Sequence, residues 1–264
     1  MRKSLFAGVL LQVLFPNLIS AQDKVRSYAN QLEKKFNIQI IYEKKVTDTW
    51  NGSRYDIPGN RKLLLNYLKI IDQEFSKYPA GYFQLALADI LILTQNYHFQ
   101  ENHQAAMPDP YGRRLYLAID GHKNNYSTEY LSSVIHHELQ HNTEYAIWSS
   151  QYYKWDAWQN ANTENFKYGP GGISAYSDLN VDWGSRSNPL PGFISLYSTL
   201  GQEEDRAEIM SMLMYNKAEA DLHAFCRKDP ILKKKIQLLS SKIEELVESS
   251  GFWRTANQPC YTNE

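Results

Sequence analysis

The stretch SSVIHHELQHNTEY, residues 132–145, constrains the fold of this chain more than any other segment. His137 and His141 are four positions apart, so on an α-helix their side chains project within about 40° of each other. Glu138 lies beside them, while apolar residues of the same stretch fall on the roughly opposite face. The pattern predicts a helix that is anchored on one face and displays two imidazoles on the other.

The ends of this helix are also marked in the sequence. Ser127 is a favourable N-cap residue, and Glu129 in the first turn interacts well with the positive end of the helix dipole. Ile135 and Leu139 form part of the apolar face. We therefore expect a helix from Ser127 to about residue 149.

Two neutral imidazoles and a third ligand suit zinc, with a fourth position left for a water molecule whose pKa falls to about 7. Glu138 would then act as the general base that takes the proton of this water. His136 is turned by 100° from His137 and is expected to point elsewhere. The alternative is coincidence, since the five-residue pattern arises by chance in about one such chain in a hundred.

The third ligand is not a histidine at the position that an extended zincin pattern requires. Glu144 and Ile147 occupy the places where that pattern has glycine and histidine. A downstream segment offers acids instead, namely Glu203, Glu204, Asp205 and Glu208. Glu204 and Glu208 share a helix face, so one can bind a metal while the other supports a ligand. Glu203 and Asp205 fit better with a solvated helix start.

Together these segments resemble gluzincin metallopeptidases, and within them the lethal-factor-type catalytic domains and a group of bacterial zinc-binding metallopeptidases. In those proteins His-Glu-x-x-His is followed, after a variable insertion, by a tyrosine and a Glu-x-x-Ala-Glu helix. The matching residues here are Tyr197 and the segment EDRAE, residues 204–208. The resemblance implies one Zn²⁺ per chain, with the following roles: His137, His141 and Glu204 as metal ligands, Glu138 as catalytic base, Glu208 as support for a ligand, and Tyr197 as hydrogen-bond donor to the oxyanion.

The chain departs from the family pattern in two places. Arg206 stands where the relatives usually carry a bulky apolar or aromatic residue, and 62 residues separate His141 from Glu204. These departures leave the implied ligand set intact and leave the substrate preference open.

The wider pattern predicts the α+β class. The resemblance implies a zincin-like metallopeptidase domain, with a small mixed sheet packed on the active-site helix and a mainly helical C-terminal half. Helices are expected at 24–36, 61–78, 127–149, from about 202, and at 230–251, and strands at 38–44, 85–99 and 113–120. By analogy, residues 116–120 would be the edge strand along which a peptide substrate adds. No composition shift marks a linker, so residues 22–264 are interpreted as one domain.

The span from about 150 to 200 is predicted to form ordered loops, because it is rich in aromatic residues, Asn, Gly and Pro. The aromatic residues in or near it are Trp148, Tyr152, Tyr153, Trp155, Trp158, Tyr168, Tyr176 and Trp183. They either line a cleft or form a small core of their own, and the second interpretation is favoured. The remaining histidines, His98, His103, His122 and His223, lack metal-pair spacing with the motif and are interpreted as structural or surface residues.

The first residues, MRKSLFAGVLLQVLFPNLISA, have the form of a secretory signal peptide covering 1–21. Its removal changes the balance from 28 cations against 29 anions to 26 against 29. No basic block is present, which argues against nucleic acid as a partner, and no later apolar run predicts a membrane span. Cys226 and Cys260 either form a disulfide or remain two separate thiols.

The sequence therefore predicts an exported, monomeric zinc metallopeptidase, periplasmic or secreted, that acts on a protein or peptide. An alternative from another class is a zinc-stabilised polypeptide- or glycan-binding protein with a vestigial site. A third possibility is a zinc hydrolase that acts on a non-peptide amide, for which the same residues would serve.

Overall fold

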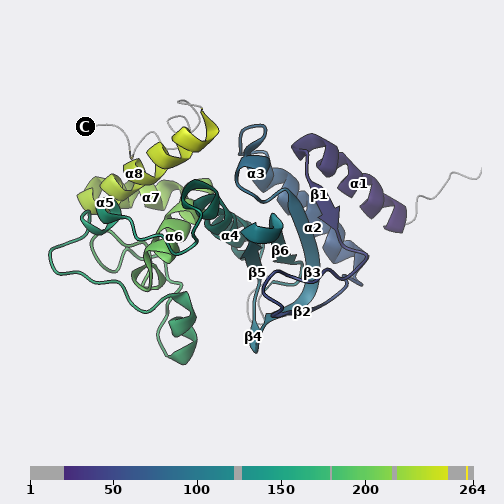
Figure 1. The fold of residues 1–264 in the computed structure, drawn as a ribbon, viewed down its shortest axis with the longest axis horizontal. Coiled ribbons are helices and arrows are strands. Elements are labelled where there is room, and N and C mark those ends of the chain that lie inside the picture. The colour runs from purple at the N-terminus through teal and green to yellow at the C-terminus, as the bar shows by residue number, and fades with distance from the viewer. Residues whose placement is uncertain (1–20, 122–126, 179, 216–218, 249–259, 261–264) are drawn as a thin grey trace, which may run out of the picture.

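The computed structural model describes residues 21–121, 127–178, 180–215, 219–248 and 260 (Figure 1). Within these residues the chain forms a mixed α/β structure with a small six-stranded sheet and eight α-helices. The expected mixture of helix and sheet is confirmed. The predicted signal segment lies outside the described residues except for Ala21, where the first helix begins.

The sheet has the order β1-β3-β6-β5. Its strands are β1 (Gln39–Ile41), β3 (Ile90–Phe99), β6 (Arg114–Ala118) and β5 (Ala106–Asp109). The first three are parallel, and β5 runs antiparallel to β6. Two short strands, β2 (Ser53–Asp56) and β4 (Asn102–His103), pair antiparallel with the end of β3.

The expected edge strand at 116–120 is wrong, because β6 is paired on both sides by β3 and β5. The edge next to the motif helix is β5 instead. Strand β2 was not predicted, since it lies within a segment rich in turn residues, where the local signals favour a loop. Its pairing with β3, more than 30 positions later in the chain, stabilises it as a strand.

The alternation of side chains along β3 and β6 builds a core on each face of the sheet. Leu91 and Leu115 belong to the main core, together with residues of α1 (Ala21–Phe36), α2 (Arg61–Phe75) and α4 (Thr128–Trp148). The neighbouring side chains Ile92, Tyr97 and Tyr116 belong to a smaller core on the opposite face. A strand that is buried on both faces is apolar almost throughout, which explains the continuous run in β3.

Helix α4 lies between the sheet and α6 (Gln202–Met214) in Figure 1, as expected from its motif. The side chain of Ser127 accepts a hydrogen bond from the backbone N–H of Tyr130, and the helix ends at Ser149 in the left-handed conformation. The predicted bounds are confirmed. Because other elements cover it on two sides, most of the residues from Leu131 to Glu144 are buried.

The C-terminal half is mainly helical, as expected. It contains α7 (Glu219–Lys228) and α8 (Pro230–Val247) after α6, and α3 (Tyr82–Leu85) packs against α8 from the first half. Cys226 of α7 is bonded to Cys260, with 5.5 Å between their Cα atoms. The disulfide therefore fixes position 260 to the helical half of the molecule.

The described residues of the span 150–200 form loops, as predicted, and also three short helical turns. These turns are α5 (Asp156–Gln159), η2 (Gly172–Ser177) and η3 (Tyr197–Thr199). Trp155 stacks on Trp158 and lies tilted against Trp148. Trp158 is fully buried in the main core, and Trp155 packs against that core. The expected separate small core is therefore wrong for these two tryptophans, which extend the main core, whereas Tyr152 remains 70% exposed.

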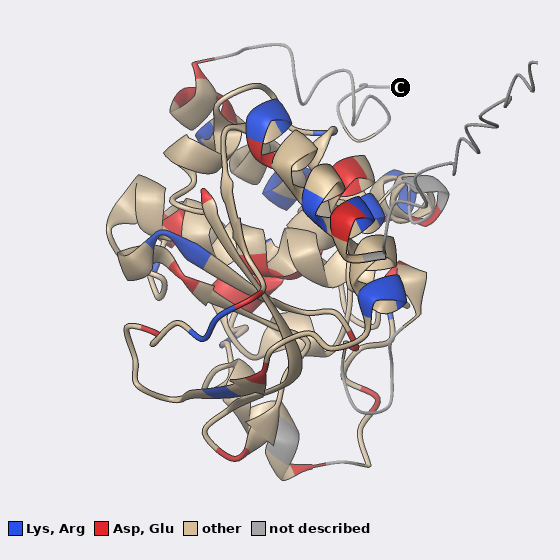
Figure 2. Cartoon of the chain, turned by 90° about the vertical axis from the view of Figure 1, so that its right-hand side faces the viewer, with Lys and Arg blue, Asp and Glu red and all other residues tan. Residues whose placement is uncertain are grey.

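Acidic and basic residues are interspersed along the helices in the coloured ribbon of Figure 2. This mixture agrees with the nearly balanced charge of the sequence. Among the described residues, no helix has both the length and the apolar composition that a membrane crossing requires.

Candidate metal centre

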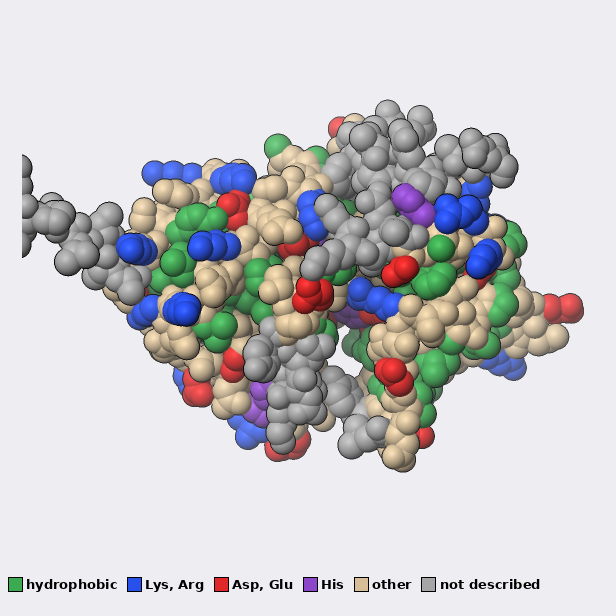
Figure 3. All heavy atoms as spheres, turned by 180° about the vertical axis from the view of Figure 1, so that it is seen from behind, with side chains coloured by type: hydrophobic (Ala, Val, Ile, Leu, Met, Phe, Trp, Pro, Cys, Tyr) green, Lys and Arg blue, Asp and Glu red, His purple; other side chains and the backbone are tan. Residues whose placement is uncertain are grey.

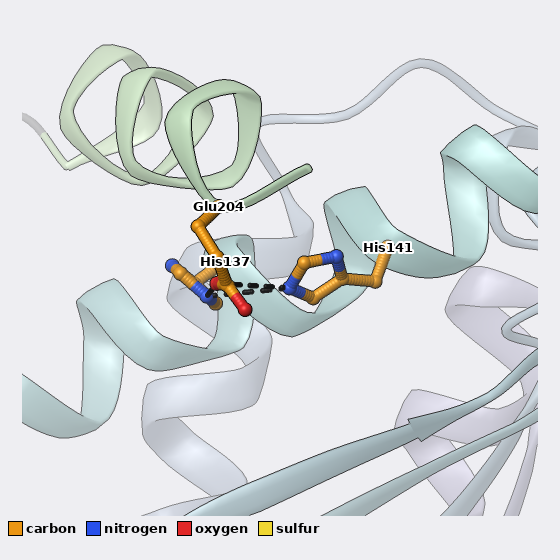
Figure 4. Close-up of side chains that lie close together, drawn as sticks. All are labelled: His137, His141 and Glu204. Carbon is orange, nitrogen blue, oxygen red and sulfur yellow. Dashed lines mark hydrogen bonds and ion pairs between the residues drawn. The ribbon is translucent and has the colours of Figure 1, made fainter. Parts of the chain in front are cut away.

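Two helices bring three ligand side chains together. His137 and His141 project from α4 toward Glu204, which comes from the first turn of α6 (Figure 4). The Nε2 atoms of the two histidines are 3.3 Å apart, and Oε2 of Glu204 lies 3.2 Å from the first and 3.6 Å from the second. This is the one group of at least three potential ligand residues among the described residues.

The spacing fits a metal ion. Ligand atoms arranged tetrahedrally around an ion at bonds of about 2.0–2.1 Å lie about 3.3 Å from one another. The three observed separations are close to that value. Two imidazole nitrogens and a carboxylate oxygen can therefore hold one metal ion between them.

The charges around these ligands are arranged for a cation. Burial raises the pKa of Glu204, but hydrogen bonds with His137 and His141 outweigh it and lower the pKa overall. Burial lowers the pKa of His137, but Glu204 and Glu208 outweigh it and raise the pKa well above its ordinary value. The pKa of His141 is likewise raised, because Glu204 outweighs the effect of burial. The carboxylates thus favour positive charge at a position that a metal ion can occupy in place of protons.

Glu208 supports one ligand from behind. Its Oε1 lies 3.1 Å from Nδ1 of His137, on the side of the ring opposite to the metal-facing nitrogen. Its Oε2 accepts a hydrogen bond of 3.1 Å from Ser195 Oγ and lies 3.9 Å from Nε of Arg186. A carboxylate in this place orients the imidazole and fixes its tautomer. Ser195 and Arg186 were not predicted, because they come from a loop without a motif.

Glu138 is half-buried beside the ligands. Burial raises the pKa of its carboxyl group, while His137 and His141 oppose the shift, and the overall change is upward. A carboxylate whose pKa moves toward neutrality is better suited to accept and return a proton near pH 7.

Tyr197 lies at the start of η3, and its ring centroid is 6.0 Å from that of His137. Its hydroxyl and the carboxylate of Glu204 both approach Gly172 closely. A Cβ atom at Gly172 would lie 2.7 Å from Cδ of Glu204 and would overlap both Oε1 of Glu204 and the tyrosine hydroxyl. A side chain at position 172 would therefore displace Glu204 or Tyr197, so Gly172 confines the third ligand from the side of the insertion.

His136 is directed away from the ligands, as predicted. Its Nε2 is 2.8 Å from Oε2 of Glu74, and its Nδ1 is 2.8 Å from the hydroxyl of Tyr78. Both partners come from α2 or the turn after it. His136 therefore connects α4 to the N-terminal helices.

The expectation that Glu203 and Asp205 are solvated is wrong, because both are buried. Oδ2 of Asp205 accepts hydrogen bonds from Lys235 Nζ (2.7 Å), Tyr168 OH (2.6 Å) and Trp158 Nε1 (2.9 Å). These partners come from α8 and from the 150–200 span. The sequence around α6 carries no sign of them, since they lie about 30 or more positions away.

Arg206 is fully buried and forms a bidentate ion pair with a residue of α4. Its Nε and Nη2 atoms donate to the two carboxylate oxygens of Glu144 at 2.7 and 2.6 Å. Its guanidinium also lies 5.0 Å from the ring of Trp148. Because Glu144 is in α4, this bidentate pair joins the two helices that carry the candidate ligands.

Two cavities of about 590 and 410 Å³ meet at the ligands. Both are lined by His137, Glu138 and Tyr197, and on the sheet side by Gln104 and Ala106. Figure 3 shows the molecule hollowed between its two halves, with a histidine visible inside the hollow. The site is therefore reached from a cleft that continues on either side of the ligands.

The other histidines that the structure describes lie outside this group of ligands. The rings of His98 and His103 meet across β3 and β4 with centroids 4.8 Å apart, and His223 belongs to α7. His122 lies outside the described residues. Comparisons of this chain with protein-family models, with curated proteins and with solved structures gave no match.

Proposed function

We propose that this protein is a zinc-dependent metallopeptidase that hydrolyses peptide bonds with Glu138 as general base. The observation that carries the proposal is the convergence of His137, His141 and Glu204 at the separations expected of ligands to one ion. Two histidines and a carboxylate are a ligand set that zinc uses in catalytic sites. The cleft that continues on both sides of the ligands supports a long, extended substrate.

A zincin-like fold is part of the proposal. It is supported by three parallel strands, by an antiparallel edge strand β5, and by the position of α4 next to that edge. A substrate that lies along β5 would pass the ligands. Ala106 of this strand lines both cavities, and Met107 and Pro108 line the smaller one.

The roles of the side chains follow from their positions. When bound, Zn²⁺ lowers the pKa of a water molecule to about 7 and polarises a carbonyl group. Glu138 accepts the proton of the attacking water and later donates it to the leaving amine. Tyr197 donates a hydrogen bond to the carbonyl oxygen as negative charge develops there. Glu208 keeps the ring of His137 oriented through Nδ1.

Metal content tests the ligand set. Protein purified without chelator is expected to contain about one zinc ion per chain, and His137→Ala and Glu204→Ala should each lose most of it. His223→Ala, a histidine of α7, is the matched control and should retain the metal. A wild-type protein that takes up no zinc at neutral pH would contradict the proposal.

Glu138→Gln tests the chemistry separately from metal binding. The variant should keep its zinc while hydrolysis of unfolded casein falls by several orders of magnitude, because the amide cannot accept the proton. Glu245→Gln, on the exposed part of α8, should behave like the wild type. Full activity of Glu138→Gln, or a zinc-loaded wild type without any hydrolysis, would favour a binding protein.

We further propose that the chain is exported. The form of residues 1–21 supports this, as does the disulfide between Cys226 and Cys260, because disulfides persist mainly in oxidising compartments. The mass of the protein recovered outside the cytoplasm should correspond to a chain that begins at Gln22.

A further inference from the structure

Large apolar side chains that face solvent gather at one end of the cleft. Eight such residues are strongly exposed in the described part of the chain, and four of them line the 410 Å³ cavity. These four are Trp50 (38% exposed), Tyr111 (53%), Tyr152 (70%) and Ile173 (66%). Single exposed apolar residues are common on protein surfaces, but a contiguous group that lines a cavity marks a binding site.

The four residues come from two parts of the chain that line the same cavity. Trp50 lies in a turn and Tyr111 in the 3-10 helix η1 (Pro110–Gly112), and their rings meet edge to face with centroids 4.9 Å apart. Tyr152 and Ile173 belong to the 150–200 span. Phe99 and Met107 also line the cavity. Apolar side chains from distant segments therefore meet in this cavity.

This apolar cavity adjoins the candidate metal centre directly. His141 and Glu204 line it together with Glu138. The other cavity, which shares His137 and Glu138, is lined by charged residues of both signs, among them Glu129, Asp182 and Arg186, and by none of the four exposed apolar residues. The two arms of the cleft therefore differ in chemistry on either side of the same ligands.

We infer that the arm formed by Trp50, Tyr111, Tyr152 and Ile173 is a subsite for an aromatic or large aliphatic side chain next to the bond that is cleaved. The inference rests on the proposed peptidase function and adds the class of substrate, namely polypeptides with such a residue on one fixed side of the scissile bond. Its occupant lies on β5, because Ala106, Met107 and Pro108 of this edge strand line the same cavity. Burial of a Phe or Leu side chain corresponds to about a tenfold to hundredfold gain in affinity.

Two fluorescein-labelled peptides with the frame Gly-Ala-Ser-Ala-X-Ala-Ser-Ala-Gly test the inference, with X as Phe or Glu. Binding is measured by fluorescence anisotropy on zinc-supplied Glu138→Gln, so that the readout does not depend on turnover. The Phe peptide should bind at least about tenfold more tightly than the Glu peptide. Ile173→Glu, introduced into the same background, should remove most of this difference.

Ile57→Glu is the matched control, because Ile57 is also an exposed isoleucine but lines neither arm of the cleft. It should leave the preference for Phe unchanged. Equal affinity for the two peptides, or an equal effect of Ile57→Glu and Ile173→Glu, would overturn the subsite.

Cleavage of the same peptides by the wild type separates the two proposals. If both peptides are cut at equal rates, the peptidase function stands and the subsite is wrong. If neither is cut while the binding preference and its loss in Ile173→Glu are observed, the apolar arm stands as a binding site for such side chains and the peptidase function fails. If only the Phe peptide is cut, at one fixed distance from Phe, both proposals are supported.

Discussion

The two helices that carry the candidate ligands, α4 and α6, are stabilised in different ways. Helix α4 has a side-chain cap at Ser127, an apolar face, and two ligands placed on one side by their spacing. Helix α6 has Gly201 at its N-cap position, without a side-chain cap, and is buried around almost its whole circumference, including Asp205 and Arg206. Local helix geometry therefore positions His137 and His141, whereas contacts with distant segments position Glu204.

The position of Glu204 depends on these distant contacts. Arg206 ties α6 to α4 through Glu144, and Asp205 ties it to α8 through Lys235. Gly172 closes against the carboxylate from the 150–200 span. Changes in these neighbours should therefore affect Glu204 more than the two histidines, which share one helix.

The largest effect should follow from breaking the pair between the helices. Arg206→Met leaves the buried carboxylate of Glu144 without its charged partner and should lower the free energy of unfolding by about 3–5 kcal/mol, as measured by urea denaturation. Arg54→Met, which breaks an exposed pair with Glu101, should cost about 0.5 kcal/mol at most. The double variant Arg206→Met with Glu144→Leu should recover much of the loss, because no unpaired charge remains. If Arg206→Met lowered the free energy of unfolding as little as Arg54→Met does, α6 would not depend on its contact with Glu144 in the way proposed.

Removal of the metal should have the next largest effect. At a free zinc concentration of about 100 times the dissociation constant, binding to the folded state adds about 2.7 kcal/mol to the free energy of unfolding. Chelation should remove this contribution and thereby lower the melting temperature. In His137→Ala and Glu204→Ala, zinc and chelator should make little difference to the melting temperature. An unchanged wild-type melting temperature with and without zinc would show that the ligands of α4 and α6 do not bind it together.

Gly172→Ala should weaken metal binding without a comparable loss of stability. The added methyl group overlaps Oε1 of Glu204 and the hydroxyl of Tyr197, so the zinc dissociation constant should rise by about tenfold or more in competition with a chelator. Gly184→Ala is the control, since no atom lies within 4 Å of its added Cβ. Equal zinc affinity in the two variants would mean that Gly172 does not position the ligand.

The smallest effects should come from the first residues of the two helices. Ser127→Ala removes the cap of α4 and should cost about 1 kcal/mol in unfolding free energy. Gly201→Ser places a capping residue at the start of α6 but should not stabilise this helix, because a Cβ at that position overlaps the carboxylate of Glu203. A clear gain in stability from Gly201→Ser would show that the close contact with Glu203 relaxes easily.

Much of the fold was predictable where local signals are strong. The bounds of α4 and the start of α8 follow from caps and periodicity. The end of β3 agrees with its expected end, but the strand begins at Ile90 and not at residue 85. The strands β2 and β5 were missed, and the edge strand was placed at β6 in place of β5. Strand order depends on contacts between segments far apart in the chain, which periodicity does not report.

In the candidate site, too, contacts between segments far apart in the chain were not predictable. His137, Glu138 and His141 are related by helix geometry alone, so their arrangement follows from their spacing. The burial of Glu203 and Asp205 was predicted wrongly, because a buried carboxylate is stable only with partners, and those of Asp205 come from α8 and from the 150–200 span.

The sequence by itself determined the helix that displays two histidines and a glutamate, the apolar strands that hold it, and the loop character of the 150–200 span. Only the tertiary structure decided that Glu204 faces the histidines, that Arg206 and Glu144 form one buried pair, and that β5 borders the cleft. The physical reason is that side-chain direction along one helix follows from a fixed rotation per residue. The burial of a charge, in contrast, depends on whether a distant segment supplies its partner.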